Sequence, residues 1–555
     1  MTYHSEKNPV FRTEIAETIF NQKYAHFGCT TWDDLCETLV RDVCGEYLSP
    51  GDKVGLVNAM RNMHFIPGGR YLYYAGRDVK YYNNCFLLRA EADTREDWAD
   101  LSYRAESCLM TGGGIGIDYS VYRPSGSPLS RTGGTSSGPI PKMQMINEIG
   151  RHVMQGGSRR SAIYASLNWQ HADAWDFMNA KNWEDLKAGT SGLTIKDLKE
   201  QDFKFPAPLD MTNISLNYDN AWLLDRDRQD NFTFKQNVLQ ALRTGEPGFS
   251  FNFWAKENET LRNACTEVTS EDDSDVCNLG SINFSRIPDL GTLKEVVRLA
   301  TLFLLCGTIR ADLPYNKVHT VRNKNRRLGL GIMGIHEWLI QRNKPYDYDP
   351  ELAEWLACYK SVSDHTATEG SFELSISAPV AVRAIAPTGT IGMLAGTTTG
   401  IEPLYAVAYK RRYLKGTEWH YQNVVDGAAR VMIDRYGTDP DNIESAIDLS
   451  KDPERRIAFQ AWVQSFVDQA ISSTINLPAW GSEANNEDKV DEFAHILSRH
   501  APMLRGFTCY PDGSRGGQPL TSIPYSEAVR TTGMEFIEEN NDICSISGKG
   551  GFCGS

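Results

Sequence analysis

The sequence lacks the features that typify membrane-bound, secreted and nucleic-acid-binding proteins. Its 555 residues contain no apolar run of the roughly eighteen residues that a membrane-spanning helix needs. The N-terminus, MTYHSEKNP, has no apolar core of the kind that a secretory signal carries. A net charge of −14 removes the broad positive field that nucleic-acid binding needs. These absences predict a cytoplasmic protein that binds neither membrane nor nucleic acid.

Metal-binding cysteine patterns are missing as well. The 12 cysteines stand at irregular spacings, without the paired CxxC arrangement of a structural zinc site. In a chain without a secretory signal, such thiols are expected to stay reduced, with a few serving in catalysis. We therefore expect no metal held by protein ligands.

The sequence does contain the alternation of helical and strand patterns that is typical of an α/β fold. Apolar positions spaced three and four apart predict a helical region over residues 1–60. The same reasoning predicts helices near 96–110, 140–155, 293–309, 332–342 and 350–369, and short apolar segments at 115–121, 213–216 and 381–385.

The segment NACTE at residues 263–267 combines residues that suit sulfur chemistry. In an extended segment alternate side chains share a face, so Asn263, Cys265 and Glu267 are expected to point the same way. A thiol between an amide and a carboxylate suits a reaction on a substrate that carries hydroxyl groups.

Four further cysteines stand out by their surroundings. Cys85 and Cys277 lie far apart in the sequence, whereas Cys544 and Cys553 belong to a C-terminal segment rich in glycine. A cysteine pair on such a segment suits a redox shuttle, because glycine-rich chain moves easily. Each of these residues, taken alone, is equally compatible with an ordinary buried or surface thiol.

Three glycine-rich turns are candidate ligand-binding segments. The turn at 112–116 is followed by a strand-like pattern, which argues against a dinucleotide-binding fingerprint. The turn at 387–392, PTGTIG, offers consecutive backbone amides and two hydroxyls as a cradle for phosphate. The segment 155–160, QGGSRR, suits a loop that rearranges when a ligand binds beside it.

Together these segments resemble the large subunit of ribonucleotide reductase, from about Phe65 to the C-terminus. The segments that carry the resemblance are FIPGGR at 65–70, NNC at 83–85, GGIGI at 113–117, TGGTSSGP at 132–139, QGGSRR at 155–160, NACTE at 263–267, CNLGSIN at 277–283, PTGT at 387–390 and YPDGSR at 510–515.

Within that family the chain resembles the adenosylcobalamin-dependent, or class II, branch. The metal-dependent branch receives its radical from a partner subunit through two adjacent tyrosines, and the last hundred or so residues hold no such pair. The segment TCYPDGSR at 508–515 is similar to the cobalamin-dependent pattern. The alternative is a metal-dependent subunit that needs a radical-generating partner. A second alternative is a nucleotide-binding regulator that has lost the chemistry.

The resemblance implies a ten-stranded α/β barrel, two antiparallel halves of five parallel strands, with a central finger loop. It divides the chain into a helical region (1–60), the barrel (61–540) and a flexible redox-active tail (541–555). Only about sixty residues precede the barrel, so we expect no full ATP-cone.

By the same resemblance, Cys265 forms the thiyl radical, Glu267 is the general base and Asn263 orients the substrate. Cys85 and Cys277 are the reducing pair, and Cys544 and Cys553 are the shuttle that regenerates them.

Substrate binding and control follow from the resemblance too. It implies substrate contacts at Asn84, Gly68 and Gly69, and phosphate contacts at Pro387, Thr388, Gly389 and Thr390. Residues Gln155, Gly156, Gly157, Ser158, Arg159 and Arg160 would form the specificity loop.

The implied cofactor is adenosylcobalamin and the implied substrate a ribonucleoside diphosphate, with a triphosphate as the alternative. A dNTP or ATP effector, thioredoxin or glutaredoxin as reductant, and a homodimer are also implied. The location would be the cytoplasm, or the host cytoplasm if the protein is phage-encoded.

Overall fold

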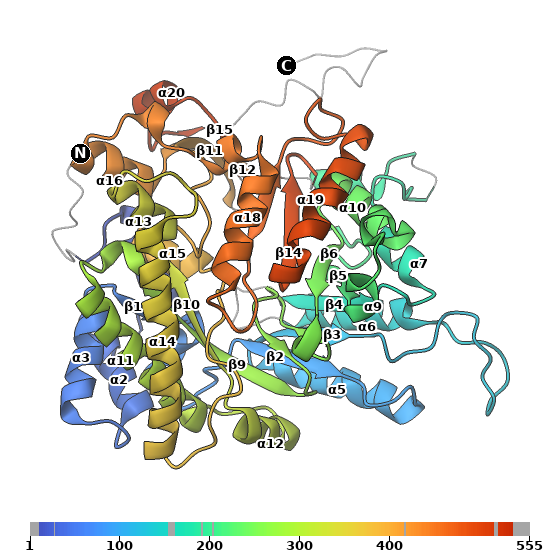
Figure 1. Cartoon of the computed structure of the whole chain (residues 1–555), viewed down its shortest axis with the longest axis horizontal. Coiled ribbons are helices and arrows are strands. Elements are labelled where there is room, and N and C mark those ends of the chain that lie inside the picture. Colours follow the sequence, from blue (N-terminus) through green and yellow to red (C-terminus); the bar gives the residue numbers. More distant parts are fainter. Residues whose placement is uncertain are drawn as a thin grey trace, which may run out of the picture.

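The computed structural model describes residues 10–26, 28–153, 161–189, 192–202, 205–415, 418–514 and 520–536. It is a mixed α/β structure in which helices surround a large sheet (Figure 1). Its strands are β1 (Phe65–Pro67), β2 (Cys85–Arg89), β3 (Gly114–Asp118), β4 (Ile163–Asn168), β5 (Thr212–Tyr218), β6 (Gly248–Phe251), β7 (Leu261–Arg262), β8 (Thr269–Ser270), β9 (Asp275–Asn283), β10 (Leu328–Met333), β11 (Ala408–Lys415), β12 (Glu418–Val425), β13 (Thr474–Leu477), β14 (Gly506–Pro511), β15 (Leu520–Ser522) and β16 (Glu535–Phe536).

The helices confirm the predicted helical segments, with ends shifted by a few residues. Within the described ranges, none of them is both long and apolar enough to cross a bilayer. They are α1 (Glu14–Ile19), α2 (Trp32–Cys44), α3 (Pro50–Arg61), α4 (Gly69–Tyr74), α5 (Arg95–Met110), α6 (Pro139–His152), α7 (Ala174–Asn179), α8 (Ile195–Gln201), α9 (Asn220–Leu223), α10 (Phe232–Thr244), α11 (Leu290–Arg310), α12 (Asn316–Asn325), α13 (Ile335–Gln341), α14 (Pro350–Glu373), α15 (Gly389–Ala395), α16 (Gly427–Tyr436), α17 (Ala446–Leu449), α18 (Pro453–Gln464), α19 (Val490–His500) and α20 (Tyr525–Thr531).

The large sheet has ten strands, in the order β1-β9-β2-β3-β4-β5-β6-β14-β13, with β10 paired to β9. Strands β2 to β6 are parallel neighbours, and β9 and β14 flank them in the antiparallel direction. Strand β10 runs parallel to β9, and β13 runs parallel to β14. Two isolated parallel bridges, Leu330 to Arg383 and Ile385 to Ile471, involve the predicted apolar segment 381–385. A separate four-stranded sheet has the order β15-β11-β12-β16.

Helices cover the large sheet on two sides, because its central strands are apolar on both faces. All nine residues of β9 are buried. Helices α2, α3, α11 and α14 lie at the left of Figure 1, and α5, α7 and α10 lie at the right. Each group packs with its own part of the sheet into a large hydrophobic core. The N-terminal helices therefore share one core with β1, β9 and β10.

A third, small cluster lies around the β7–β8 hairpin. It joins two side chains of the hairpin to five residues of β2, β9 and the segment before α15: Leu261, Val268, Cys85, Leu87, Cys277, Leu279 and Ala386. Two of its members are the cysteines predicted to form the reducing pair. The hairpin thus brings the predicted reactive segment against the sheet.

The turn at 112–116 behaves as its sequence predicts. Residues 114–118 form β3 and no helix follows the turn, so the dinucleotide-binding geometry is absent at this turn. Residue 116 is glycine for a separate structural reason. A Cβ added there would lie 1.7 Å from the carbonyl oxygen of Arg262, so only glycine lets the β7–β8 hairpin approach β3 this closely.

Candidate active site

The segment 263–267 is the turn of the β7–β8 hairpin. Strands β7 and β8 pair through Leu261 with Ser270 and Arg262 with Thr269. At the tip, Thr266 has a φ of 71° and its amide donates to the carbonyl oxygen of Asn263 at 3.0 Å. The expected extended row of alternating side chains is therefore wrong, because closing the hairpin requires a left-handed residue inside the segment.

The turn places Cys265 apart and keeps Asn263 and Glu267 together. Cys265 is exposed, whereas Asn263 and Glu267 are buried. The Nδ2 group of Asn263 donates to Glu267 Oε2 at 2.9 Å, and its Oδ1 accepts from the amide of Val268 at 3.0 Å. The amide side chain therefore closes the turn and fixes the carboxylate at the same time.

Asn263 also joins the turn to strand β2. Its Nδ2 group donates to Cys85 Sγ at 3.0 Å, and the Cys85 thiol donates to Glu267 Oε1 at 3.9 Å. Amide, carboxylate and thiol thus form one buried network that joins residues far apart in the sequence.

Burial controls the protonation of this network. It raises the pKa of Glu267 to about 7, although hydrogen bonds from Asn263 and Cys85 oppose the shift. Burial, reinforced by the negative charge of Glu267, also raises the pKa of Cys85 well above its usual value. A carboxyl group with a pKa near neutrality suits general acid–base catalysis. A protonated thiol beside it suits proton donation.

Cys85 and Cys277 are cross-strand neighbours. They are paired in the antiparallel register of β2 and β9, where Cα atoms lie roughly 4.5–5.5 Å apart. That spacing falls within the range that a disulfide spans. Burial raises the pKa of Cys277 well above its usual value too. The structure therefore brings together the two cysteines of the predicted reducing pair.

A pocket opens over the hairpin turn and contains most of the predicted site residues. Its lining combines the turn with β2, the start of α4 and the segment before α15: Tyr24, Gly68, Gly69, Arg70, Asn84, Cys85, Gly112, Gly114, Ala162, Asn263, Ala264, Cys265, Glu267, Leu279, Gly280, Ser281, Ala386, Pro387, Thr388, Gly389, Thr390 and Ile391. Cys277 does not belong to this lining and lies opposite Cys85 on the neighbouring strand β9.

The predicted phosphate cradle forms one wall of the pocket. Thr388 has a φ of 50°, and its Oγ1 accepts from the amide of Gly400 at 2.8 Å. This hydroxyl oxygen therefore holds the loop itself. A Cβ added at Gly389 would meet no protein atom within 4 Å. The first backbone amides of a helix have no partner within the helix, so those of α15 are available to a ligand.

Asn84 and Gly68 shape another part of the lining. The Oδ1 atom of Asn84 is buried and has no hydrogen-bond partner among the described residues. A Cβ added at Gly68 would lie 3.0 Å from this oxygen. A buried acceptor without a partner is costly, so a ligand that donates a hydrogen bond here would relieve that cost.

Two lining side chains had no role assigned from the sequence. Arg70 ends the segment FIPGGR, and Tyr24 belongs to the N-terminal helical region. Arg70 is the one lysine, arginine or histidine among the described lining residues. The pattern around Tyr24 gave no sign that it reaches the pocket, because only the tertiary fold brings residue 24 to residue 69.

Some predicted residues cannot be placed. The specificity-loop residues 155–160 and the shuttle residues Cys544 and Cys553 lie outside the described residues. Among the residues that the structure does describe, no group of three or more His, Cys, Asp or Glu side chains could hold a metal ion.

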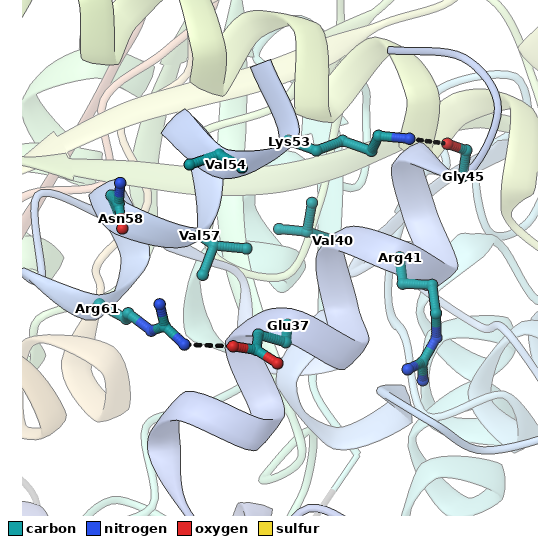
Figure 2. Close-up of a pocket in the computed structure, with 9 residues that line it drawn as sticks. All are labelled: Glu37, Val40, Arg41, Gly45, Lys53, Val54, Val57, Asn58 and Arg61. Carbon is teal, nitrogen blue, oxygen red and sulfur yellow. Dashed lines mark hydrogen bonds and ion pairs between the residues drawn. The ribbon is translucent and has the colours of Figure 1, made fainter. Parts of the chain in front are cut away.

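A second pocket lies between α2 and α3 (Figure 2). Its floor is apolar, with Val40 and Val57 between the helices. Arg61 pairs with Glu37 at one end, and Lys53 donates to the carbonyl oxygen of Gly45 at the other. This second pocket contains none of the predicted site residues, so the candidate active site is the pocket over the β7–β8 hairpin.

Comparison with known proteins identifies the family of the chain. The family model of the ribonucleotide reductase barrel domain matches residues 83–200, 234–379 and 379–499. The chain therefore belongs to the ribonucleotide reductase family.

Curated relatives cover most of the chain. A vitamin B12-dependent ribonucleoside-diphosphate reductase of Mycobacterium tuberculosis (strain CDC 1551 / Oshkosh) is 28% identical over 86% of this chain and 74% of its own length. A reductase of the same name from Thermoplasma acidophilum is 26% identical over 86% of this chain and 67% of its own. A putative adenosylcobalamin-dependent ribonucleoside-triphosphate reductase of Mycobacterium phage D29 is 27% identical over 82% of this chain and 75% of its own length.

Proposed function

We propose that this chain reduces ribonucleoside diphosphates to 2′-deoxyribonucleoside diphosphates by thiyl-radical chemistry, with adenosylcobalamin as its cofactor. The observation that carries the proposal is the arrangement of three cysteines. Cys85 and Cys277 are buried opposite each other, and Cys265 is exposed at the turn beside them. One accessible thiol and two buried reducing thiols are what a radical reduction of a ribose requires.

The proposed reaction begins and ends at Cys265. Its thiyl radical takes the hydrogen atom from C3′, and Glu267 accepts the proton of the 3′ hydroxyl. The 2′ hydroxyl leaves as water with a proton from the reducing pair. Cys85 and Cys277 then supply two electrons and the second proton, which form the C2′–H bond, and they become a disulfide. Glu267 returns its proton to the 3′ oxygen, and Cys265 returns its hydrogen atom to C3′. Asn263 would hold the substrate in register during these steps.

The residues present fit the proposed cofactor. Bound adenosylcobalamin supplies the radical by homolysis of its cobalt–carbon bond. Cys265 is exposed, so its thiol is accessible from outside the chain, whereas Cys85 and Cys277 are shielded. This division would let the radical that the cofactor supplies reach Cys265 while Cys85 and Cys277 stay protected.

We further propose that the ten-stranded sheet closes into the barrel of the family. The parallel set β2 to β6 would form one half, and β9, β10, the segment 381–385, β13 and β14 would form the other. The bridges at Arg383 and Ile385 support this closure. In a closed barrel, bound substrate and cofactor would cover the hairpin turn, exclude water and protect a radical there.

Substrate control and regeneration complete the proposal. Residues 387–390 would bind the diphosphate, and residues 155–160 would transmit the identity of a dNTP or ATP effector. Cys544 and Cys553 would reduce the Cys85–Cys277 disulfide by thiol exchange and be reduced in turn by thioredoxin or glutaredoxin. A homodimer and the domain limits 1–60, 61–540 and 541–555 belong to the same proposal.

The test is anaerobic turnover of CDP and CTP by the purified chain with a dithiol and a deoxynucleotide effector. Deoxycytidine product that forms only with adenosylcobalamin supports the cofactor, and the preferred substrate gives the phosphate level. No product from a folded chain would instead favour the metal-dependent alternative with a partner subunit. A Cys265→Ala variant that kept full activity would refute the mechanism.

A further inference from the structure

Tyr24 is the one residue of the N-terminal helices among the described lining of the active-site pocket. It is the last residue of a π-helical turn, η1 (Phe20–Tyr24), and its side chain is only 5% exposed. π-Helical turns occur frequently at functional sites. Resting on the function proposed above, we propose that the Tyr24 hydroxyl binds the phosphate-bearing end of the substrate.

The path of the N-terminal segment explains how Tyr24 is held there. Arg12 donates to Glu337 Oε1 of α13 at 2.6 Å and to the carbonyl oxygen of Gly396 at 3.5 Å. Thr13 caps α1 by accepting from the amide of Ala16 at 3.1 Å. Helix α1 then packs against α15, the helix that follows the phosphate cradle. The segment is therefore fastened to the cradle on one side before it reaches the pocket.

The other side of Tyr24 meets the start of α4. A Cβ added at Gly69 would lie 3.1 Å from the Tyr24 hydroxyl oxygen, so the hydroxyl lies directly against the backbone at this glycine. A side chain at residue 69 would require the Tyr24 hydroxyl to shift by a few tenths of an ångström. The contact places the phenolic oxygen beside Gly69, in the lining of the pocket that also contains residues 387–391.

The charged side chains that line the pocket are compatible with an anionic ligand beside Tyr24. Among the described lining residues Glu267 is the one carboxylate and Arg70 the one cation. Glu267 is fastened to Asn263 and Cys85 in the hairpin network. A phenol donates one hydrogen bond without bringing a charge into the pocket. A hydrogen bond to a charged phosphate oxygen contributes more binding free energy than one to a neutral acceptor. We therefore expect substrate affinity to fall about tenfold or more when the hydroxyl is removed.

The experiment compares Tyr24→Phe with Tyr82→Phe in the full chain. Tyr82 is a matched control, because it is buried in the same hydrophobic core and its hydroxyl has no hydrogen-bond partner among the described residues. Both variants keep the ring and lose only the hydroxyl. The measurements are KM and kcat for CDP, and the ³¹P resonances of CDP bound to each protein.

We expect Tyr24→Phe to raise KM for CDP about tenfold, with kcat within about twofold of wild type. The ³¹P resonances of bound CDP should move in Tyr24→Phe and not in Tyr82→Phe. An unchanged KM, or a loss of affinity without any ³¹P change, would overturn the assignment.

Failure of this inference is distinguishable from failure of the proposed function. If wild type turns over CDP and Tyr24→Phe matches it, only the role of Tyr24 is wrong. If wild type neither binds nor reduces CDP, the proposed function itself fails. Equal thermal unfolding midpoints for both variants and wild type would show that a change in KM does not come from misfolding.

Discussion

Cys85 lies directly opposite Cys277 in the antiparallel pairing of β2 and β9. Both thiols are buried, and burial holds the pKa of each well above its usual value. Such thiols react slowly as nucleophiles, because the thiolate is the reactive form. They remain available as proton donors and as a pair that can form a disulfide. The pairing therefore separates the reducing function from the exposed Cys265.

The cysteine pair predicts the outcome of a single turnover. Without added reductant, we expect a Cys544→Ser/Cys553→Ser variant, which lacks the proposed shuttle, to form a disulfide between Cys85 and Cys277 in proportion to the deoxynucleotide produced. Peptide mapping by mass spectrometry under nonreducing conditions would detect it. Cys277→Ser should form neither this disulfide nor deoxynucleotide product. Replacement of Cys108, which is buried away from the pocket, by Ser should leave the disulfide yield unchanged. A full product yield without the disulfide would contradict the assignment.

The raised pKa of Glu267 predicts a pH dependence. Because the carboxyl group titrates at about 7 and acts as a base only when ionised, the rate should rise with pH up to about 7 and then level off. Glu267→Gln should lower the rate at pH 8 by about a hundredfold or more and abolish this rise. The check is kcat/KM for CDP from pH 5.5 to 8.5. If kcat/KM of Glu267→Gln still rose with pH as it does in wild type, the titration would belong to another group.

The close approach of the hairpin to β3 predicts a strong effect of Gly116→Ala. Since the new Cβ would lie 1.7 Å from the carbonyl oxygen of Arg262, the hairpin must move away from the sheet. We expect activity to be lost, with the unfolding midpoint in urea lowered. Gly51→Ala is the control, because its Cβ would meet only the Ser49 hydroxyl at 3.8 Å on helix α3. It should keep activity and gain up to about 1 kcal/mol in free energy of unfolding.

The buried ion pair between Arg12 and Glu337 predicts a stability effect of the N-terminal segment. The Arg12 side chain is 15% exposed and that of Glu337 is 0% exposed. Removal of one partner of a buried pair costs about 3–5 kcal/mol, so Arg12→Ala should lower the free energy of unfolding by that amount. Urea denaturation would measure it.

The control for this pair is an exposed one. Arg95 and Glu96 form an ion pair on the surface, and Arg95→Ala should leave stability unchanged. Affinity for CDP should also fall in Arg12→Ala, because α1 orients Tyr24 and packs against α15. Equal stability of the Arg12→Ala and Arg95→Ala variants would show that the buried pair does not anchor the segment.

The sequence predicted those features that depend on local pattern or on a run of adjacent residues. Helices such as α11 and α14 follow from apolar spacing over several turns. The absence of a dinucleotide fingerprint at 112–116 follows from the strand-like residues after the turn. The family resemblance rested on short ordered segments, and those at 65–70, 83–85, 263–267 and 387–390 contribute residues to the lining of the pocket.

Local reasoning failed where chain reversal sets the geometry. Asn263, Cys265 and Glu267 were expected in one row, but the left-handed Thr266 turns the chain and sends Cys265 outward. The hydrogen bond between Asn263 and Glu267 exists because of that turn. The alternation of residues in the sequence does not predict this hydrogen bond, because the turn is fixed by hairpin pairing between β7 and β8.

By itself, then, the sequence determined the main helices and the family and supplied the candidate reactive residues, because these depend on residue type and spacing along the chain. Only the tertiary structure decided that Cys85 faces Cys277, that Glu267 is buried enough to titrate near neutrality, and that Tyr24 reaches Gly69. These facts depend on sheet register, desolvation and packing between segments distant in the chain. All three are properties of the folded surroundings and not of any single stretch of residues.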